Sequence, residues 1–108
     1  MLEKLLVEEA RRRAEVFKNL NRYLRIIYQT VKELDENAET YVFGSVVEGK
    51  SLISSDIDIL VVTSHQPEHV ISKLWKKGIK EPFEIHVVDK EKLKFYLKHV
   101  KAIKKLEF

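Results

Sequence analysis

The sequence predicts a small α+β fold, in which a sheet of three or more strands carries helices packed mainly on one face. Two observations lead to this prediction. Apolar residues recur at spacings of three and four in three separate stretches, which is helical periodicity. Short runs rich in β-branched and aromatic residues separate the stretches and are typical of buried strands. The predicted order is helix, strand, strand, helix, strand, helix.

The first element is a helical segment over residues 1–36. A continuous helix of this length would run about 50 Å, whereas a compact domain of this size has a radius of gyration of about 13 Å. We therefore expect the helix to break around residues 19–21, or to project and pack against a second copy or a partner. Its apolar stripe consists of Leu6, Ala10, Ala14, Phe17, Leu20, Leu24, Ile27, Val31 and Leu34.

Residues 40–108 are predicted to form the sheet core and a C-terminal helix. Strands are expected at 39–43 (ETYVF), 56–63 (DIDILVVT) and 82–88 (PFEIHVV), and a loop with one helical turn at 44–55. A helix over 66–78 begins near Pro67 and stops at Gly78, and its apolar face places Trp75 in the core. The last helix is expected over 91–106.

Length and composition narrow the class of protein. The 108 residues suit one domain, 1–108, and the absence of cysteine excludes a disulfide framework and agrees with a cytoplasmic location. No apolar run approaches the roughly 20 residues of a membrane span. The net charge of +3 does not require nucleic-acid binding. The lysine-rich stretch from Lys90 onward is interpreted as a solvated helix face, with a patch for an anionic substrate or acidic partner as the alternative.

Asp56 and Asp58 are the central feature of the second predicted strand. Residues i and i+2 of a strand point to the same face, so both carboxylates project together, about 6.5–7 Å apart along the chain. The apolar residues Ile57 and Ile59 indicate a buried strand, where unpaired carboxylates are costly. A divalent cation such as Mg²⁺ would offset both the repulsion and the burial. Alternatively, the two aspartates lie at the exposed start of the strand and face water.

Gly44 and Ser45 precede this pair and strengthen the cation interpretation. A glycine that ends a strand lets the backbone approach a phosphate closely. If a helical turn starts there, its N–H groups and the Ser45 hydroxyl form an anion site. A phosphate site and a carboxylate pair on strands joined by one loop suit a metal-bound triphosphate.

Gly44-Ser45, the loop, and the run Ser55-Asp56-Ile57-Asp58-Ile59-Leu60-Val61-Val62 together resemble the signature of the DNA polymerase beta-like nucleotidyltransferase superfamily. Within it, the short chain resembles the minimal nucleotidyltransferases of prokaryotes. The motif region covers residues 41–62, and the order of strands and helices extends the resemblance to about residue 90. The resemblance implies a small nucleotidyltransferase-type mixed sheet.

The same resemblance implies a third carboxylate on a later strand, and Glu84 is the candidate. Alternation places Glu84 and His86 on one face of that strand, with Phe83, Ile85 and Val87 on the other. A glutamate in an otherwise apolar strand needs a partner, and a metal ion would supply one; the alternative is contact with solvent or a lysine. A lone histidine is more often structural, and the role of His86 stays open.

The activity that the resemblance implies is transfer of a nucleoside monophosphate from an NTP, with ATP as the first choice, to an acceptor hydroxyl. Two Mg²⁺ ions, with Mn²⁺ as a substitute, would be held by the catalytic residues Asp56, Asp58 and Glu84. Glu84 would also orient or deprotonate the hydroxyl. The nucleotide and its phosphates would be held by Gly44, Ser45, Lys50 and Ser55.

Glu48 departs from the pattern, because relatives often carry a basic residue at this place in the loop. An acid there repels a triphosphate, although Lys50 can compensate. Two functions are weighed, and a nucleic-acid polymerase or tailing enzyme is ranked below both, because 108 residues leave no room for a domain that grips a primer or a transfer RNA. One is a nucleotidyltransferase that acts as the antitoxin of a two-component pair and AMPylates a HEPN-type toxin. The other is a non-catalytic partner-binding module that retains the fold with a weakened nucleotide site.

Overall fold

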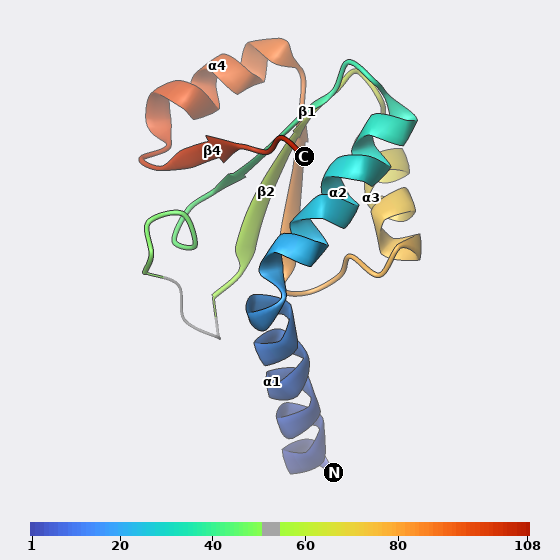
Figure 1. Ribbon diagram of the computed structural model, residues 1–108, viewed down its shortest axis with the longest axis vertical. Helices are drawn as coiled ribbons and strands as arrows, with labels where there is room; N and C mark the ends of the chain where they lie inside the picture. Colours follow the sequence, from blue (N-terminus) through green and yellow to red (C-terminus); the bar gives the residue numbers. More distant parts are fainter. Residues whose placement is uncertain (51–54) are drawn as a thin grey trace.

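The computed structural model describes residues 1–50 and 55–108, and these residues form four helices and four strands (Figure 1). The order β3-β2-β1-β4 runs across one mixed sheet, in which β2 and β3 are parallel and the other neighbours antiparallel. The predicted α+β class, with a mixed sheet of three or more strands, is confirmed. In chain order the elements are α1 (Leu2–Lys18), α2 (Leu20–Leu34), β1 (Glu39–Phe43), β2 (Ile57–Val62), α3 (Pro67–Lys76), β3 (Phe83–Val88), α4 (Lys90–His99) and β4 (Ile103–Lys105).

The N-terminal helical segment breaks at Asn19, inside the expected range. Its ψ of 31° does not continue a helix, and its side-chain Nδ2 donates to the carbonyl of Glu15 at 3.0 Å. α2 packs on the sheet, whereas α1 projects away from it (Figure 1). Along α1, Leu2, Leu5 and Leu6 are exposed. The expected break is therefore confirmed and α1 projects as an arm, whereas packing of this arm against a second copy or a partner stays a prediction.

The two faces of the sheet differ in what covers them. Ile57, Ile59 and Val61 of β2 point to the face covered by α2 and α3, where the main core lies. The alternate residues Leu60 and Val62 point to the opposite face, where Leu93 of α4 packs (Figure 1). The prediction of helices mainly on one face is confirmed for α2 and α3, and α4 covers part of the other face.

The predicted position of Trp75 in the core is wrong. α3 begins with Pro67 at its first turn and ends before Gly78, as expected, but it buries Val70 and Leu74. Trp75 follows Leu74 by about 100° around the helix, at the border of this stripe, and is 55% exposed. Its ring instead lies 4.9 Å from the ammonium of Lys80.

The predicted helix over 91–106 is too long. α4 ends at His99, Val100 is extended with a ψ of 129°, and β4 follows and pairs with β1. The pairing satisfies the backbone hydrogen-bonding groups along the open edge of β1. It extends one residue beyond β4, where the Leu106 N–H donates to the carbonyl of Thr40 at 2.8 Å. Lysine-rich sequence fits a helix face or an edge strand equally well, so local periodicity could not distinguish them.

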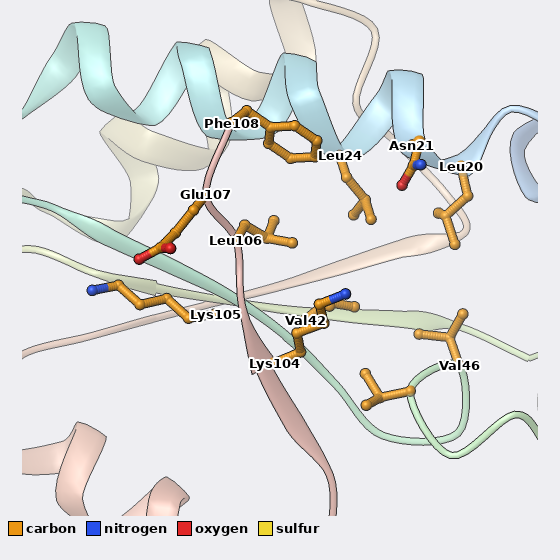
Figure 2. Close-up of a pocket in the computed structure, with 11 residues that line it drawn as sticks. Leu20, Asn21, Leu24, Val42, Val46, Lys104, Lys105, Leu106, Glu107 and Phe108 are labelled. Carbon is orange, nitrogen blue, oxygen red and sulfur yellow. The ribbon is translucent and has the colours of Figure 1, made fainter.

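The chain continues from β4 across α2 and lines a groove there (Figure 2). Leu106 is buried, and the ring of Phe108 lies 5.7 Å from that of Tyr28. Figure 2 shows Leu106 and Phe108 beside Leu24 of α2, with Val46 of the Gly44 loop across the groove. Among the residues that the structure describes, no helix has the length and apolarity to cross a membrane.

Candidate active site

Asp58, Glu84 and His86 come together on the parallel pair β2–β3. The register pairs Asp58 with Glu84 directly and Leu60 with His86, so the three polar side chains share one face. Each offers one ligand atom, and these atoms all lie within 4.8 Å of one another. The Nε2 atom of His86 lies 3.3 Å from Asp58 Oδ1 and 3.7 Å from Glu84 Oε1. The parallel register, which alternation in the sequence does not reveal, creates this group.

The group is open to solvent on one side. The side chains of Asp58 and His86 are each 27% exposed, and that of Glu84 is 55% exposed. The rings of Phe43 and Tyr96 lie 5.2 Å and 6.2 Å from the imidazole of His86. A half-open polar group with aromatic walls is accessible to an ion or a ligand while its histidine is held in place.

Gly44 leaves room for the carboxylate of Asp58. Its φ is +85°, which side chains disfavour, and a Cβ at this position would lie 2.7 Å from Asp58 Oδ2. Its N–H donates to the carbonyl of Ala102 at 3.1 Å, just before β4, so in this conformation it does not point to a phosphate. The backbone of Gly44 instead approaches the predicted metal ligand.

The loop after Gly44 contains the helical turn that the sequence predicted. The N–H groups of Val47 and Glu48 donate to the Gly44 carbonyl at 3.1 and 3.2 Å, and Lys50 N–H donates to the Ser45 carbonyl at 3.0 Å. Ser45 thus begins the turn and is half-buried. Residues 51–54 of the predicted loop lie outside the described residues.

Two lysines flank Glu48. Its carboxylate oxygen lies 4.0 Å from Lys50 Nζ and 3.9 Å from Lys101 Nζ. The negative charge of Glu48, which opposes triphosphate binding, is therefore partly offset by these two lysines. Sequence reasoning identified Lys50 but not Lys101, because Lys101 was assigned to a continuous helix. The signal that could have identified Lys101 is the lysine-rich stretch from Lys90 onward, if it is interpreted as a patch that faces an anionic substrate.

Asp56 lies just before β2 and apart from the group of Asp58, Glu84 and His86. Its side chain is 51% exposed, and its Oδ1 lies 3.6 Å from a guanidinium nitrogen of Arg13 on α1. Arg13 also donates to the carbonyl of Ser55 at 3.3 Å. Sequence reasoning placed Arg13 on the helical segment without a role, and no local pattern signals this long-range contact.

The guanidinium of Arg13 is held mainly by two nearby glutamates. It pairs with Glu81, next to β3, and with Glu9 one turn earlier at 3.5 Å. Burial of Arg13 disfavours its charge, but the hydrogen bonds and charges of Glu81 and Glu9 outweigh this and raise the pKa of Arg13. The same hydrogen bond lowers the pKa of Glu81. Asp56 is thus one of three carboxylates that pair with Arg13.

The donor set fits a divalent metal ion. Carboxylate oxygens are the ligands that Mg²⁺ prefers, and an imidazole nitrogen is accepted by Mn²⁺, Zn²⁺ and their neighbours. Asp58 and Glu84 are already adjacent, and Asp56 would join them by exchanging Arg13 for the ion. The groove beside α2 in Figure 2 includes none of these carboxylates.

Comparison with known proteins agrees with this geometry. Residues 24–107 match the family described as "Nucleotidyltransferase domain". A solved structure described as a candidate nucleotidyltransferase is similar over 78% of this chain and 97% of its own, with 30% sequence identity and a TM-score of 0.64. A second candidate, from Sulfolobus solfataricus, supports the fold with 24% identity and a TM-score of 0.51 over 92% of this chain and 83% of its own.

None of the curated proteins matches this chain. The family match covers more than half of the chain and includes Gly44, Asp56, Asp58 and Glu84. The match to the 30% identical structure covers almost the whole of that chain. The chain therefore belongs to the nucleotidyltransferase domain family and is an enzyme of the transferase class.

Proposed function

We propose that this chain transfers a nucleoside monophosphate from an NTP, with ATP as the first substrate to test, to an acceptor hydroxyl. The observation that carries the proposal is the convergence of Asp58 and Glu84, with His86, on adjacent parallel strands beside Gly44. Family membership supplies the reaction class, and this convergence supplies the place where it would occur.

Each residue would contribute by its position. Asp56, Asp58 and Glu84 would hold two Mg²⁺ or Mn²⁺ ions, which stabilise the charge on the attacking and leaving oxygens when bound. The phosphates would be faced by the hydroxyl of Ser45 and the ammonium groups of Lys50 and Lys101. The same two lysines offset the negative charge of Glu48. Ser55 directly precedes Asp56 in the chain and would contribute to holding the nucleotide there.

Glu84 would take the acceptor proton, a role supported by its being the more exposed of the two adjacent carboxylates. The acceptor oxygen forms a bond to the α-phosphorus, and the bond from that phosphorus to the bridging oxygen of the β-phosphate breaks. Pyrophosphate leaves with the electron pair of the broken bond, and the hydroxyl proton passes to Glu84.

The proposed acceptor is a hydroxyl of a protein partner. The exposed apolar residues Leu2, Leu5 and Leu6 on the projecting α1 support a role for this helix in association, with a partner chain or with a second copy. Resemblance to antitoxin nucleotidyltransferases makes a HEPN-type toxin the partner to test, with AMPylation as the modification.

The first experiment is calorimetric titration of ATP in the presence and absence of Mg²⁺. We expect binding that requires Mg²⁺ and that falls more than about 100-fold in Asp58→Asn, because loss of even an outer-shell partner of a metal ligand costs 10–100-fold in affinity. Asp56→Asn tests whether Asp56 leaves Arg13 to join the site. Glu68→Gln, an exposed carboxylate on α3, is the matched control and should bind as the native chain does.

A folded protein that gives no heat with ATP, CTP, GTP or UTP would contradict the proposed activity. The chain would then be the alternative, a non-catalytic module that binds its partner through the retained fold. The acceptor is tested separately, by following label from the α-phosphate of ATP into a purified HEPN-type partner.

A further inference from the structure

We infer that His86 is a direct nitrogen ligand of the divalent cation and that it shifts the preference of the site from Mg²⁺ toward Mn²⁺. The inference rests on the proposed function, because it concerns the metal site of Asp58 and Glu84. It adds a third ligand, of a different chemical type, to the two carboxylates.

The hydrogen bond between His86 Nε2 and Asp58 Oδ1 is long for one to a charged group, so a shared ion can replace it. His86 Nε2 lies 3.3 Å from Asp58 Oδ1 and 3.7 Å from Glu84 Oε1. A charge-assisted N–H···O bond would be about 2.7–2.9 Å long. Neighbouring ligands around an octahedral cation at about 2.1 Å from each atom lie about 3.0 Å apart. The ligand atoms of all three side chains already lie within 4.8 Å of one another, so small side-chain movements would bring them around one ion.

The orientation of the imidazole supports the same role. Phe43 of β1 and Tyr96 of α4 hold the ring from different elements, at centroid distances of 5.2 Å and 6.2 Å. The two aromatic rings also contact each other at 5.6 Å, which makes a continuous wall. A ring confined in this way presents Nε2 to the carboxylates without paying much side-chain entropy on metal binding.

An imidazole ligand changes which ion binds best. Mg²⁺ favours oxygen ligands, whereas Mn²⁺ and the later transition metals accept imidazole nitrogen. A site with two carboxylates and one imidazole therefore gains more affinity for Mn²⁺ than for Mg²⁺. A purely structural histidine, hydrogen-bonded to Asp58, would give no such discrimination.

The test uses Mn²⁺ alone as the probe, because its unpaired electrons report the ligands directly. In the native chain we expect a nitrogen hyperfine coupling in the pulsed EPR spectrum of bound Mn²⁺, and we expect the coupling to disappear in His86→Gln. Calorimetry should show Mn²⁺ affinity falling about 10-fold in His86→Gln, with a smaller loss for Mg²⁺. His69→Gln, an exposed histidine on α3, should change neither measurement.

The outcomes separate the inference from the proposed function. Mn²⁺ that binds the native chain without nitrogen coupling, or a coupling that persists in His86→Gln, overturns the role of His86 and leaves the carboxylate site intact. Equal losses of Mn²⁺ and Mg²⁺ affinity would also overturn the metal preference. A folded native chain that binds no Mn²⁺ at all contradicts the proposed metal site itself, and the inference with it.

Discussion

The two faces of the sheet use the same strand in different ways. Toward α2 and α3, β2 presents Ile57, Ile59 and Val61, all fully buried in the main core. Toward α4, the same strand presents Asp58, which lies in a half-open polar group. One face excludes water and holds the fold together, whereas the other keeps a partly exposed carboxylate beside a second one.

This difference indicates where stability and function reside. Apolar burial on the α2–α3 face contributes the larger share of the free energy of folding. The two carboxylates on the α4 face repel each other without a cation, so they contribute little or oppose folding. Substitutions on the two faces should therefore have separable effects on unfolding and on metal binding.

Leu74→Ala is expected to have the largest effect on stability. Leu74 on α3 is fully buried against the core, so its truncation should lower the free energy of unfolding by about 2–5 kcal/mol. Urea denaturation measures this loss. Metal affinity of the remaining folded protein should stay unchanged, and a large loss of affinity would show that the two faces are not separable.

Gly44→Ala should affect both properties, because Gly44 lies at the border of the site. Its φ of +85° predicts a strain of about 1–2 kcal/mol for alanine. The added Cβ would also displace the Asp58 carboxylate, so metal affinity should fall at least about 10-fold. Gly49→Ala is the matched control, since Gly49 has a φ of +72° and open space around it. If both variants lose metal affinity equally, displacement of Asp58 is not the cause.

Arg13→Ala sharpens the distinction between Asp56 and Asp58. Removing the cation that pairs with Asp56 should raise Mg²⁺ affinity up to about fivefold, because such an ion pair is worth up to about 1 kcal/mol. Arg12→Ala is the control, since the neighbouring Arg12 pairs with Glu81, at 3.9 Å. Calorimetric titration of Mg²⁺ measures both. Lower affinity in Arg13→Ala would instead indicate that Arg13 positions Asp56 for the ion.

The smallest expected effect concerns the pH dependence of stability and involves Asp35, which lies away from the metal site. A hydrogen bond from the Thr63 hydroxyl at 2.6 Å, with one from Asn37 N–H at 3.0 Å, holds the pKa of Asp35 below its usual range. This contribution to stability is present above the pKa of the unfolded chain and is lost as the pH falls through the lower folded value.

Thr63→Val removes the larger of these two causes. The free energy of unfolding near neutral pH should fall by about 0.5 kcal/mol, and its decline with acid should become shallower. Urea denaturation across acidic pH values measures the slope. An unchanged slope would assign the acid dependence to other carboxylates, and metal affinity should not change in either case.

Sequence reasoning predicted the parts that depend on local patterns. The strand at residues 39–43 matches β1, and the strands expected at 56–63 and 82–88 match β2 and β3 within two residues at either end. The break near Asn19 follows from the length of an uninterrupted helix, and the end of α3 from Gly78. The nucleotidyltransferase family follows from Gly44-Ser45 and the two aspartates, which the family match confirms.

Features that depend on distant residues could not be predicted in this way. Nothing local distinguishes β4 from a continued helix, because only the unpaired edge of β1 makes strand pairing favourable there. Arg13 reaches Asp56 across 43 positions, from a helix to the start of a strand. Lys101 reaches Glu48 only because α4 ends early.

The sequence by itself therefore determined which chemical groups this protein carries and on which elements they lie. Tertiary structure decided which of them meet. Alternation along β3 places Glu84 and His86 on one face, but only the parallel register of β2 and β3 brings Asp58 opposite Glu84 and within reach of His86. Register is a property of two strands packed on a common core, and no single strand contains it.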